Sequence, residues 1–552
     1  MNLRSGEIRT VEQRETFLER DQVFPTFVSR LEKSARSFCR VLERSPIGFL
    51  AGFSLLYFSA SVTLAYWKLM WFDELCTYHI ATLPAAAIWS TLASRTGPMP
   101  PSFYLLTRFS QQWLGPSHVA IRFPELIGFI VASLCLFHFI RRRTNALYGL
   151  VGMLAFWITG AYPFAYEARP YGLVLGFCGL ALVCWQAATE NVRRSWALLG
   201  LFAACAGAVG SHYGAVMLVF PLALGELVRS ISRRKLDWPV WLAFCGGGGL
   251  PLLVFLPLLR ASISPYGLAM STRPQANSIL HCYTELLSMA GHPLAAILCA
   301  LAIWRTVRAR GILTGRDSRL SSMPLREIAA AIGFLLLPVI GVLQAVLVTD
   351  QISPRYVMPL VMGFGILVAL LAYENLRDDA VGGLLIAALL LAGWGSHVRR
   401  EYLRLRPEGD RVQAFYRAAA RQPGGLSIVI NSGWFFQLAH YTPAEFSSRL
   451  VYLLDPDAAR EYSGTDTVDL CLLGYARFLP LNLRPADPFL RTGRPFLLDA
   501  PSDGWLLPVL QSEGAKIELV GIAGGRMLYR VEPNQVGSKL AVKWQPATPM
   551  KR

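Results

Sequence analysis

The sequence predicts a polytopic α-helical membrane protein with about eleven transmembrane helices and a C-terminal α/β domain outside the cytoplasm. Of its 552 residues, 53% are hydrophobic and only 16% are charged, whereas an average soluble domain has about 25% charged residues. The mean hydropathy is +0.39, and many apolar runs approach the roughly 20 residues that a membrane-spanning helix needs. From residue 398 onwards, short β-rich runs alternate with helix-like stretches. These features exclude a soluble enzyme, a disordered scaffold and a fibre.

The predicted spans are apolar runs that lie between a polar N-terminal segment and the β-rich region. The two short runs on either side of Ser211 form either two tilted helices or one broken helix. The runs lie at 47–67, 119–140, 145–163, 171–188, 196–210, 214–228, 239–258, 287–304, 328–348, 357–373 and 380–396.

Basic residues in alternate loops set the expected orientation, because the cytoplasmic loops of membrane proteins are enriched in Lys and Arg. We therefore expect the N-terminus in the cytoplasm and the segment after Ser396 outside. Most of the net charge of +17 is thereby explained by topology, and nucleic acid is not an expected partner. The basic loops contain Arg141–Arg143, Arg193, Arg194, Arg229, Arg233, Arg234, Lys235 and the arginines from Arg305 to Arg326.

The chain divides into three expected regions. Residues 1–45 are a charged N-terminal segment, either a helix on the membrane surface or a solvated tail. Residues 46–397 are the membrane region, with a long first outer loop at 68–118. Residues 398–552 are the outer domain, in which strands alternating with helices predict a largely parallel sheet. Apolar residues at helical spacing in the N-terminal segment are Leu31, Ala35, Phe38 and Leu42.

The first outer loop opens with two carboxylates, Asp73 and Glu74, directly after two aromatic residues. A carboxylate at the water boundary can act as a general base, although a solvated helix start explains the pair equally simply. Two apolar stretches follow at 83–93 and 103–114, and both are too short to span a bilayer. They predict helices that lie along the membrane surface.

Other outer turns also place a charged or polar group next to an aromatic residue. Arginine can hold a phosphate through two parallel hydrogen bonds, and tyrosine suits an interface that is half apolar and half wet. Each turn alone has a simpler explanation as an interface anchor or a structural histidine, but together they suit an anionic lipid headgroup. The residues are Glu167, Arg169, Tyr171, His212, Tyr213, Arg355 and Tyr356.

These motifs resemble the C-type (GT-C) membrane glycosyltransferases that use polyprenyl-phosphate sugars. The chain is similar to the protein O-mannosyltransferases, the bacterial lipid A aminoarabinose transferases and the rhizobial galacturonosyltransferases. The resemblance covers roughly residues 45–375. It rests on Phe72-Asp73-Glu74, Pro100-Pro101-Ser102-Phe103-Tyr104, Arg122-Phe123-Pro124, Glu167-Ala168-Arg169-Pro170-Tyr171 and Pro354-Arg355-Tyr356.

The resemblance implies transfer of a sugar from a polyprenyl phosphate to an extracytoplasmic hydroxyl, with inversion at the anomeric carbon. The acceptor would be a cell-envelope glycan, a lipid or a protein, and the membrane would be a bacterial inner membrane. Asp73 is the expected base beside Glu74, and Arg169 and Arg355 are candidates for the lipid phosphate. Relatives often have Lys or His where this chain has Met99, so a contact made there is lost or supplied elsewhere, for example by His212.

The remaining residues of the predicted donor site are Glu167, Tyr171, Tyr213 and Tyr356. No cofactor is expected, because a phosphate is already a good leaving group. Some C-type families use a divalent metal, but the sequence contains no metal-binding pattern beyond Asp73 and Glu74.

Two other classes of protein compete with this interpretation. A secondary transporter would have ionisable residues near mid-membrane and repeated halves with broken helices, whereas here the ionisable residues cluster at the outer ends. A receptor or assembly factor on the same scaffold would not need Asp73. The sugar, the acceptor, the prenyl length, the oligomeric state and the role of the outer domain remain open at this level.

Overall fold

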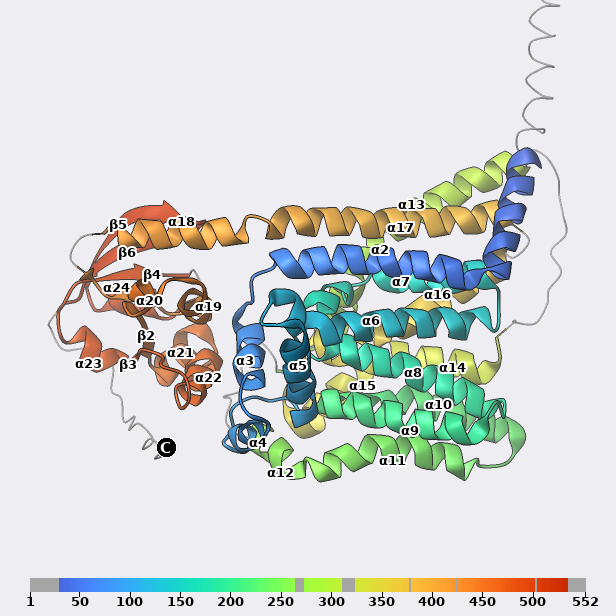
Figure 1. Cartoon of the computed structure of the whole chain (residues 1–552), viewed down its shortest axis with the longest axis horizontal. Helices are drawn as coiled ribbons and strands as arrows, with labels where there is room; N and C mark the ends of the chain where they lie inside the picture. Colours follow the sequence, from blue (N-terminus) through green and yellow to red (C-terminus); the bar gives the residue numbers. More distant parts are fainter. Residues whose placement is uncertain are drawn as a thin grey trace, which may run out of the picture.

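A helical bundle and a smaller α/β domain lie at opposite ends of the long axis of the molecule (Figure 1). The computed structural model describes residues 29–263, 273–309, 323–376, 379–422, 425–501 and 504–534. Residues 264–272 and much of the basic loop between Arg305 and Arg326 lie outside these residues. The first 28 residues also lie outside them, and the rest of the N-terminal segment contains a helix at 29–44.

Seven of the described helices are long and apolar enough to cross a membrane. An eighth span is formed if the bent pair α14 (Leu325–Leu335) and α15 (Leu337–Gln344), with the turn that follows it, is counted as one. Each of the predicted apolar runs is occupied by helix, which confirms a multi-pass membrane protein, while the number of spans stays a prediction. The long helices are α2 (Pro46–Trp67), α6 (His118–Arg141), α8 (Tyr171–Thr189), α9 (Arg194–Ser211), α10 (Val219–Arg233), α13 (Ser278–Ala309) and α17 (Ala380–Leu405).

Shorter apolar helices fill the remaining predicted runs. They are α7 (Ala146–Trp157), α11 (Trp238–Val254) and α16 (Leu360–Leu376). Short helical turns connect several of the long helices: η1 (Tyr162–Tyr166) precedes α8, η2 (Tyr213–Leu218) precedes α10, η4 (Ala345–Thr349) follows α15 and η5 (Pro354–Val357) precedes α16.

Helices α6 and α8 pack closely because glycines face each other between them. A Cβ atom at Gly128 would lie 2.4 Å from the carbonyl oxygen of Gly172, and one at Gly176 would lie 2.6 Å from that of Gly128. Small residues permit such close approach of helix backbones in membranes. The packing brings Glu125 to the start of α8, where its Oε2 accepts a hydrogen bond of 2.8 Å from the Leu173 amide. A carboxylate is favourable at a helix N-terminus, so Glu125 fixes the chain just after Arg169.

The first outer loop folds into three helices between the bundle and the α/β domain (Figure 1). These are α3 (Phe72–Ala81), α4 (Ala85–Ala93) and α5 (Pro101–Leu114), and α12 (Leu256–Ile263) packs near α4. Helices α4 and α5 match the two apolar stretches that the sequence predicts to lie along the surface.

The C-terminal domain contains a six-stranded sheet in the order β3-β2-β1-β4-β6-β5. Strands β3, β2, β1 and β4 are parallel to one another, β6 pairs antiparallel with β4, and the edge strand β5 pairs antiparallel with β6. The predicted α/β domain with a largely parallel sheet is thus confirmed. The strands are β1 (Ile428–Ile430), β2 (Leu450–Leu454), β3 (Leu483–Pro485), β4 (Phe496–Asp499), β5 (Lys516–Ala523) and β6 (Arg526–Glu532).

Short helices cover the sheet, and one long helical segment joins it to the bundle. Residue 398, where the sequence changes composition, falls inside α17, which continues to Leu405 and is followed at once by α18 (Glu408–Ala420). The composition therefore changes inside a helix, well before the first strand of the domain begins. The covering helices are α19 (Trp434–Tyr441), α20 (Ala444–Ser447), α21 (Pro456–Ser463), α22 (Thr467–Tyr475), α23 (Ala486–Leu490) and α24 (Leu506–Ser512).

Candidate functional site

The centre of the candidate site is the carboxylate of Asp73, in the first turn of α3. Its Oδ2 atom is ion-paired with Nη1 of Arg169 and lies 3.9 Å from Nη1 of Arg355. The Asp73 side chain is 32% exposed and that of Arg169 is 7% exposed. The carboxylate is therefore anchored by a buried cation and still reachable from outside the protein.

Aromatic rings surround this group of charges. The guanidinium of Arg169 lies 5.4 Å from the ring centre of Trp71 and 5.4 Å from that of Tyr171. The ring of His212 packs between those of Tyr171, at 5.4 Å, and Tyr356, at 5.7 Å. The structure thus joins segments from four separate parts of the chain around Asp73, and all of these segments were predicted from the sequence.

Several buried polar atoms in this group have no hydrogen-bond partner among the residues that the structure describes. They include Nε of Arg355, the hydroxyl of Tyr171 and the indole nitrogen of Trp71. A buried polar atom without a partner costs about 1–3 kcal/mol. These unpaired donors therefore suit a polar ligand that binds beside Asp73.

His212 is a neutral member of the group. Removal from water and the charges of Arg169 and Arg355 lower its pKa to about 3. Its Nδ1 atom accepts a hydrogen bond of 3.0 Å from the Gly214 amide, so the ring proton is on Nε2. Neutral His212 can therefore donate one hydrogen bond without adding a third positive charge.

Glu74 lies in a different environment from its neighbour Asp73. Its side chain is fully buried, and its two oxygens accept hydrogen bonds of 2.7 Å from Nε and Nη2 of Arg122. Burial alone would raise its pKa, but the Arg122 charge lowers it below the usual range. The geometry supports a structural role for Glu74, and the catalytic role expected for it beside Asp73 stays an untested prediction that this environment does not favour.

Arg122 was not singled out as a site residue, although it positions both sides of the Asp73–Arg169 pair. Besides Glu74, it donates to the carbonyl oxygens of Ala65 and Lys68, at 2.5 Å and 2.7 Å. Glu74 in turn accepts from the Ala168 amide at 2.7 Å. This buried network fixes the residues next to Asp73 and next to Arg169.

Glu167 pairs with Lys68 rather than with the arginines of the site. Both side chains are largely buried, at 14% and 10% exposure, and the Lys68 amine lies 5.4 Å from the ring centre of Tyr166. The sequence reasoning missed Lys68. Lys68 could have been noticed because it is a basic residue at the end of the bundle opposite to the basic loops. Its position departs from the charge bias of the chain.

Tyr213 follows His212 in the chain and begins η2. No described ring contact or ion pair joins it to Asp73, and its buried hydroxyl has no partner among the described residues. The roles predicted for Tyr213 and for the other members of the group stay predictions.

An apolar pocket of about 460 Å³ adjoins the site between α5, α8, α9 and α11. Ser211, the residue before His212, contributes to its lining, and Ser102 at its rim donates a hydrogen bond to the Gly210 carbonyl oxygen. The other lining residues are Leu106, Phe177, Ala206, Gly207, Gly210, Leu250, Pro251, Val254 and Phe255.

No group of three or more His, Cys, Asp or Glu side chains is placed to hold a metal ion in the part of the chain that the structure describes. The expectation of transfer without a metal or another cofactor stays a prediction.

Comparisons with known proteins match both the sequence and the fold. Residues 98–260 match the family model described as dolichyl-phosphate-mannose-protein mannosyltransferase. Two structures of ArnT from Cupriavidus metallidurans, one in the apo state and one bound to undecaprenyl phosphate, have a TM-score of 0.52 and 13% sequence identity. The similarity covers 87% of this chain and 98% of theirs. The matches indicate a glycosyltransferase.

The predicted resemblance to the C-type membrane glycosyltransferases is therefore confirmed. The Archaeoglobus fulgidus oligosaccharyltransferase is also similar, with a TM-score of 0.43 and 10% identity over 82% of this chain and 69% of that chain. No curated protein matches this sequence. The residues matched by the family model include Arg169 and His212, while Asp73 and Arg355 lie outside them.

Proposed function

We propose that this chain transfers a sugar from a polyprenyl-phosphate donor to the hydroxyl of a cell-envelope glycan, lipid or protein. The observation that carries the proposal is the Asp73 carboxylate, held beside two arginines of which one, Arg355, keeps an unpaired buried nitrogen. A carboxylate base can remove the proton of the acceptor hydroxyl. Arginines with free N–H donors beside it can hold the phosphate that leaves. The fold similarity to an ArnT bound to undecaprenyl phosphate supports the same donor class.

The donor lies across the border between the polar site and the apolar pocket. Its phosphate contacts Arg355 and Arg169, and its prenyl chain enters the pocket that begins at Ser211. The two kinds of surface adjoin each other, so one amphipathic molecule can occupy both. The hydroxyl of Tyr171 and the Nε2 proton of neutral His212 are further donors for the phosphate or the sugar.

The reaction is a direct displacement. The acceptor oxygen attacks the anomeric carbon, the bond from this carbon to the phosphate oxygen breaks, and the acceptor proton goes to Asp73. The polyprenyl phosphate leaves with its negative charge met by Arg355 and Arg169, and the configuration at the anomeric carbon inverts. In the free protein Arg169 is paired with Asp73. Because the donor phosphate competes for the same guanidinium, donor binding releases the carboxylate to accept the proton.

The Asp73 end of the bundle faces the periplasm in this proposal, and the N-terminus lies in the cytoplasm of a bacterium. The charge bias of the loops supports this orientation. Arg141, Arg142 and Arg143 lie at the end of α6 that is remote from Arg122 and the site. The outer domain then stands beside the site, where an acceptor arrives.

The release of free polyprenyl phosphate tests the proposed function. The purified full chain is incubated with a panel of polyprenyl-phosphate sugars and a cell-envelope fraction as the source of acceptors. We expect acceptor-dependent release from one donor, with the sugar recovered on an envelope component. Movement of an intact donor across proteoliposomes without any release would instead support a transporter.

A further inference from the structure

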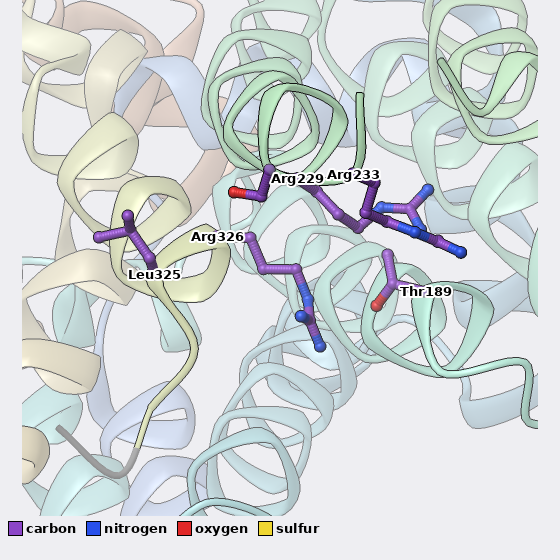
Figure 2. Close-up of a pocket in the computed structure, with 6 residues that line it drawn as sticks. Thr189, Arg229, Arg233, Leu325 and Arg326 are labelled. Carbon is purple, nitrogen blue, oxygen red and sulfur yellow. The ribbon is translucent and has the colours of Figure 1, made fainter. Parts of the chain in front are cut away.

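A second polar pocket, of about 240 Å³, lies at the end of the bundle opposite to Asp73. Figure 2 shows arginine side chains reaching toward Thr189, the last residue of α8. Tyr171 of the candidate site is the first residue of the same helix, so about 27 Å of helix separates the two sites at 1.5 Å per residue. The lining residues are Thr189, Arg229, Ser232, Arg233, Leu325 and Arg326, from the ends of α8 and α10 and the start of α14.

Arg229 keeps an unused hydrogen-bond donor although it is almost completely buried. Its side chain is 4% exposed, and its Nε and Nη2 atoms bind Glu226 and Asp237. Its Nη1 atom has no partner among the described residues. A guanidinium that is desolvated and only partly satisfied favours an anion at the open position.

Arg326 and Arg233 add positive charge that the described carboxylates do not neutralise. The nearest carboxylate to Arg326 belongs to Glu327, at 3.9 Å, and Glu327 is already held by Arg143. The buried Nε of Arg326 has no partner in the described part of the chain. No ion pair of Arg233 is found with any described residue, and its guanidinium is exposed.

The surroundings of the pocket are basic overall. Each nearby carboxylate is already committed to at least one arginine, and the arginines outnumber the carboxylates. The carboxylates are Glu190, Glu226, Asp237 and Glu327, and the arginines are Arg142, Arg143, Arg194, Arg229, Arg233 and Arg326.

We propose that this pocket binds a phosphate group, either on the headgroup of an anionic membrane lipid or as free phosphate. Arginine matches phosphate geometry through paired N–H donors. The pocket is smaller than the roughly 300–1,000 Å³ of sites that enclose a whole organic ligand, so it suits one tetrahedral anion. Leu325 at its rim and Ile231 nearby are each 67% exposed, which places apolar surface where lipid chains would lie.

Bound phosphate connects two helices through their arginines and a third through Thr189. Arg229 and Arg233 belong to the last turns of α10, Arg326 to the first turn of α14, and Thr189 ends α8. Neutralising the unpaired guanidinium groups stabilises the end of the bundle where these helices meet. The expected effect is a higher unfolding temperature, which can be measured without any knowledge of the enzymatic activity.

Thermal unfolding of the purified, delipidated full chain in a neutral detergent tests the proposal. One arm adds inorganic phosphate against chloride at equal ionic strength, and the other adds phosphatidylglycerol against an uncharged diacylglycerol. We expect at least one of them to raise the unfolding temperature of the wild type. Protection by inorganic phosphate alone identifies free phosphate as the ligand, and protection by phosphatidylglycerol alone identifies a lipid headgroup.

Matched variants locate the effect within the molecule. Arg326→Gln and Arg233→Gln each remove one charge from the pocket, and Lys235→Gln removes one charge from the adjacent exposed surface. Each pocket variant should bind the protecting ligand at least about tenfold more weakly, as expected for a lost charge-assisted hydrogen bond, while Lys235→Gln should bind like the wild type. Arg233 is exposed, so Arg233→Gln remains informative if Arg326→Gln does not fold.

Three results would overturn the proposal. The first is the absence of protection by both ligands. The second is an equal loss of affinity in Lys235→Gln and in the pocket variants, because general surface charge would then explain the binding. Unchanged affinity in both pocket variants would equally place the bound phosphate elsewhere, for example near Arg355 at the candidate site.

Discussion

Arg355 has the least complete set of partners among the charged groups around Asp73. It lies 3.9 Å from the carboxylate, its side chain is 32% exposed, and its buried Nε has no partner among the described residues. Arg169, by contrast, is buried and directly paired. We therefore expect Arg355 to gain the most from a donor phosphate.

Replacing Arg355 with Lys should weaken donor binding by about tenfold, because the charge remains while the two-pronged geometry is lost. Binding of a polyprenyl-phosphate donor to the purified variant measures this effect. Arg273→Lys is the matched control, since Arg273 is an exposed arginine whose partner is Asp350 at 3.5 Å. Unchanged donor affinity in a folded Arg355→Lys protein would argue against a direct contact with the phosphate.

The lowered pKa of His212 predicts how the stability of the folded protein depends on pH. Its pKa is lowered to about 3 by desolvation and by two arginines, whereas an unfolded histidine has a pKa of about 6.5. The folded protein therefore disfavours protonation, so the stability that neutral His212 contributes is present above pH of about 6.5 and is lost as the pH falls from there toward 3.

Thermal unfolding of the wild type and of His212→Asn between pH 7.5 and 4.5 should reveal this difference. The unfolding temperature of the wild type should fall more steeply with decreasing pH than that of the variant. Equal slopes would mean that His212 is accessible to protons in the folded protein.

At the scale of elements, α3 connects the candidate site to the α/β domain. Its Asp73 faces the arginines, while its other side contacts the domain. The Phe72 ring lies 6.0 Å from that of Phe436, and the Tyr475 hydroxyl donates to the Cys76 carbonyl oxygen at 2.9 Å. The domain thus supports the helix that contains Asp73, the proposed base.

This contact predicts a specific cross-link. The Sγ atoms of Cys76 on α3 and Cys471 on α22 lie 3.5 Å apart, within reach of a disulfide after a small movement. Oxidation of the purified protein with copper phenanthroline should produce a Cys76–Cys471 peptide pair in mass spectrometry. Cys471→Ser should abolish the pair, and its absence from the oxidised wild type would contradict the docking of the domain on α3.

The sequence could predict which helices and strands exist and which turns contain polar groups, because apolar runs and the charged segments between them are local patterns. Asp73, Arg169, His212 and Arg355 were found in this way. The sequence could not predict that Glu74 is buried while Asp73 stays partly exposed. Neighbouring side chains on a helix point about 100° apart, and only tertiary packing decides which one is buried. The Lys68–Glu167 pair depends on the same packing.

At the scale of the whole molecule, the two ends of the bundle differ in their electrostatics. Helix α3, which contains Asp73, lies at the end of the bundle next to the α/β domain (Figure 1), and the arginine-rich pocket lies at the opposite end of α8 from Tyr171. This polarity agrees with the orientation inferred from the loops. It also places the α/β domain on the side from which an acceptor would approach.

Labelling of single cysteines in intact cells tests this orientation. With a reagent that cannot cross the inner membrane, Ser448→Cys in the α/β domain should react, and Ser195→Cys at the start of α9 should not. Both side chains are exposed in the structure, so burial does not explain a difference. Labelling of Ser195→Cys alone would reverse the proposed topology.

The central claim is that Asp73 is the base in sugar transfer, and Asp73→Asn tests it most directly. The substitution keeps the shape of the side chain and removes its basicity, so the variant should fold and bind the polyprenyl-phosphate donor. Transfer measured beside donor binding should fall by about 10²–10⁴-fold, the usual contribution of a general base. Near-normal transfer by a folded Asp73→Asn protein would contradict the account.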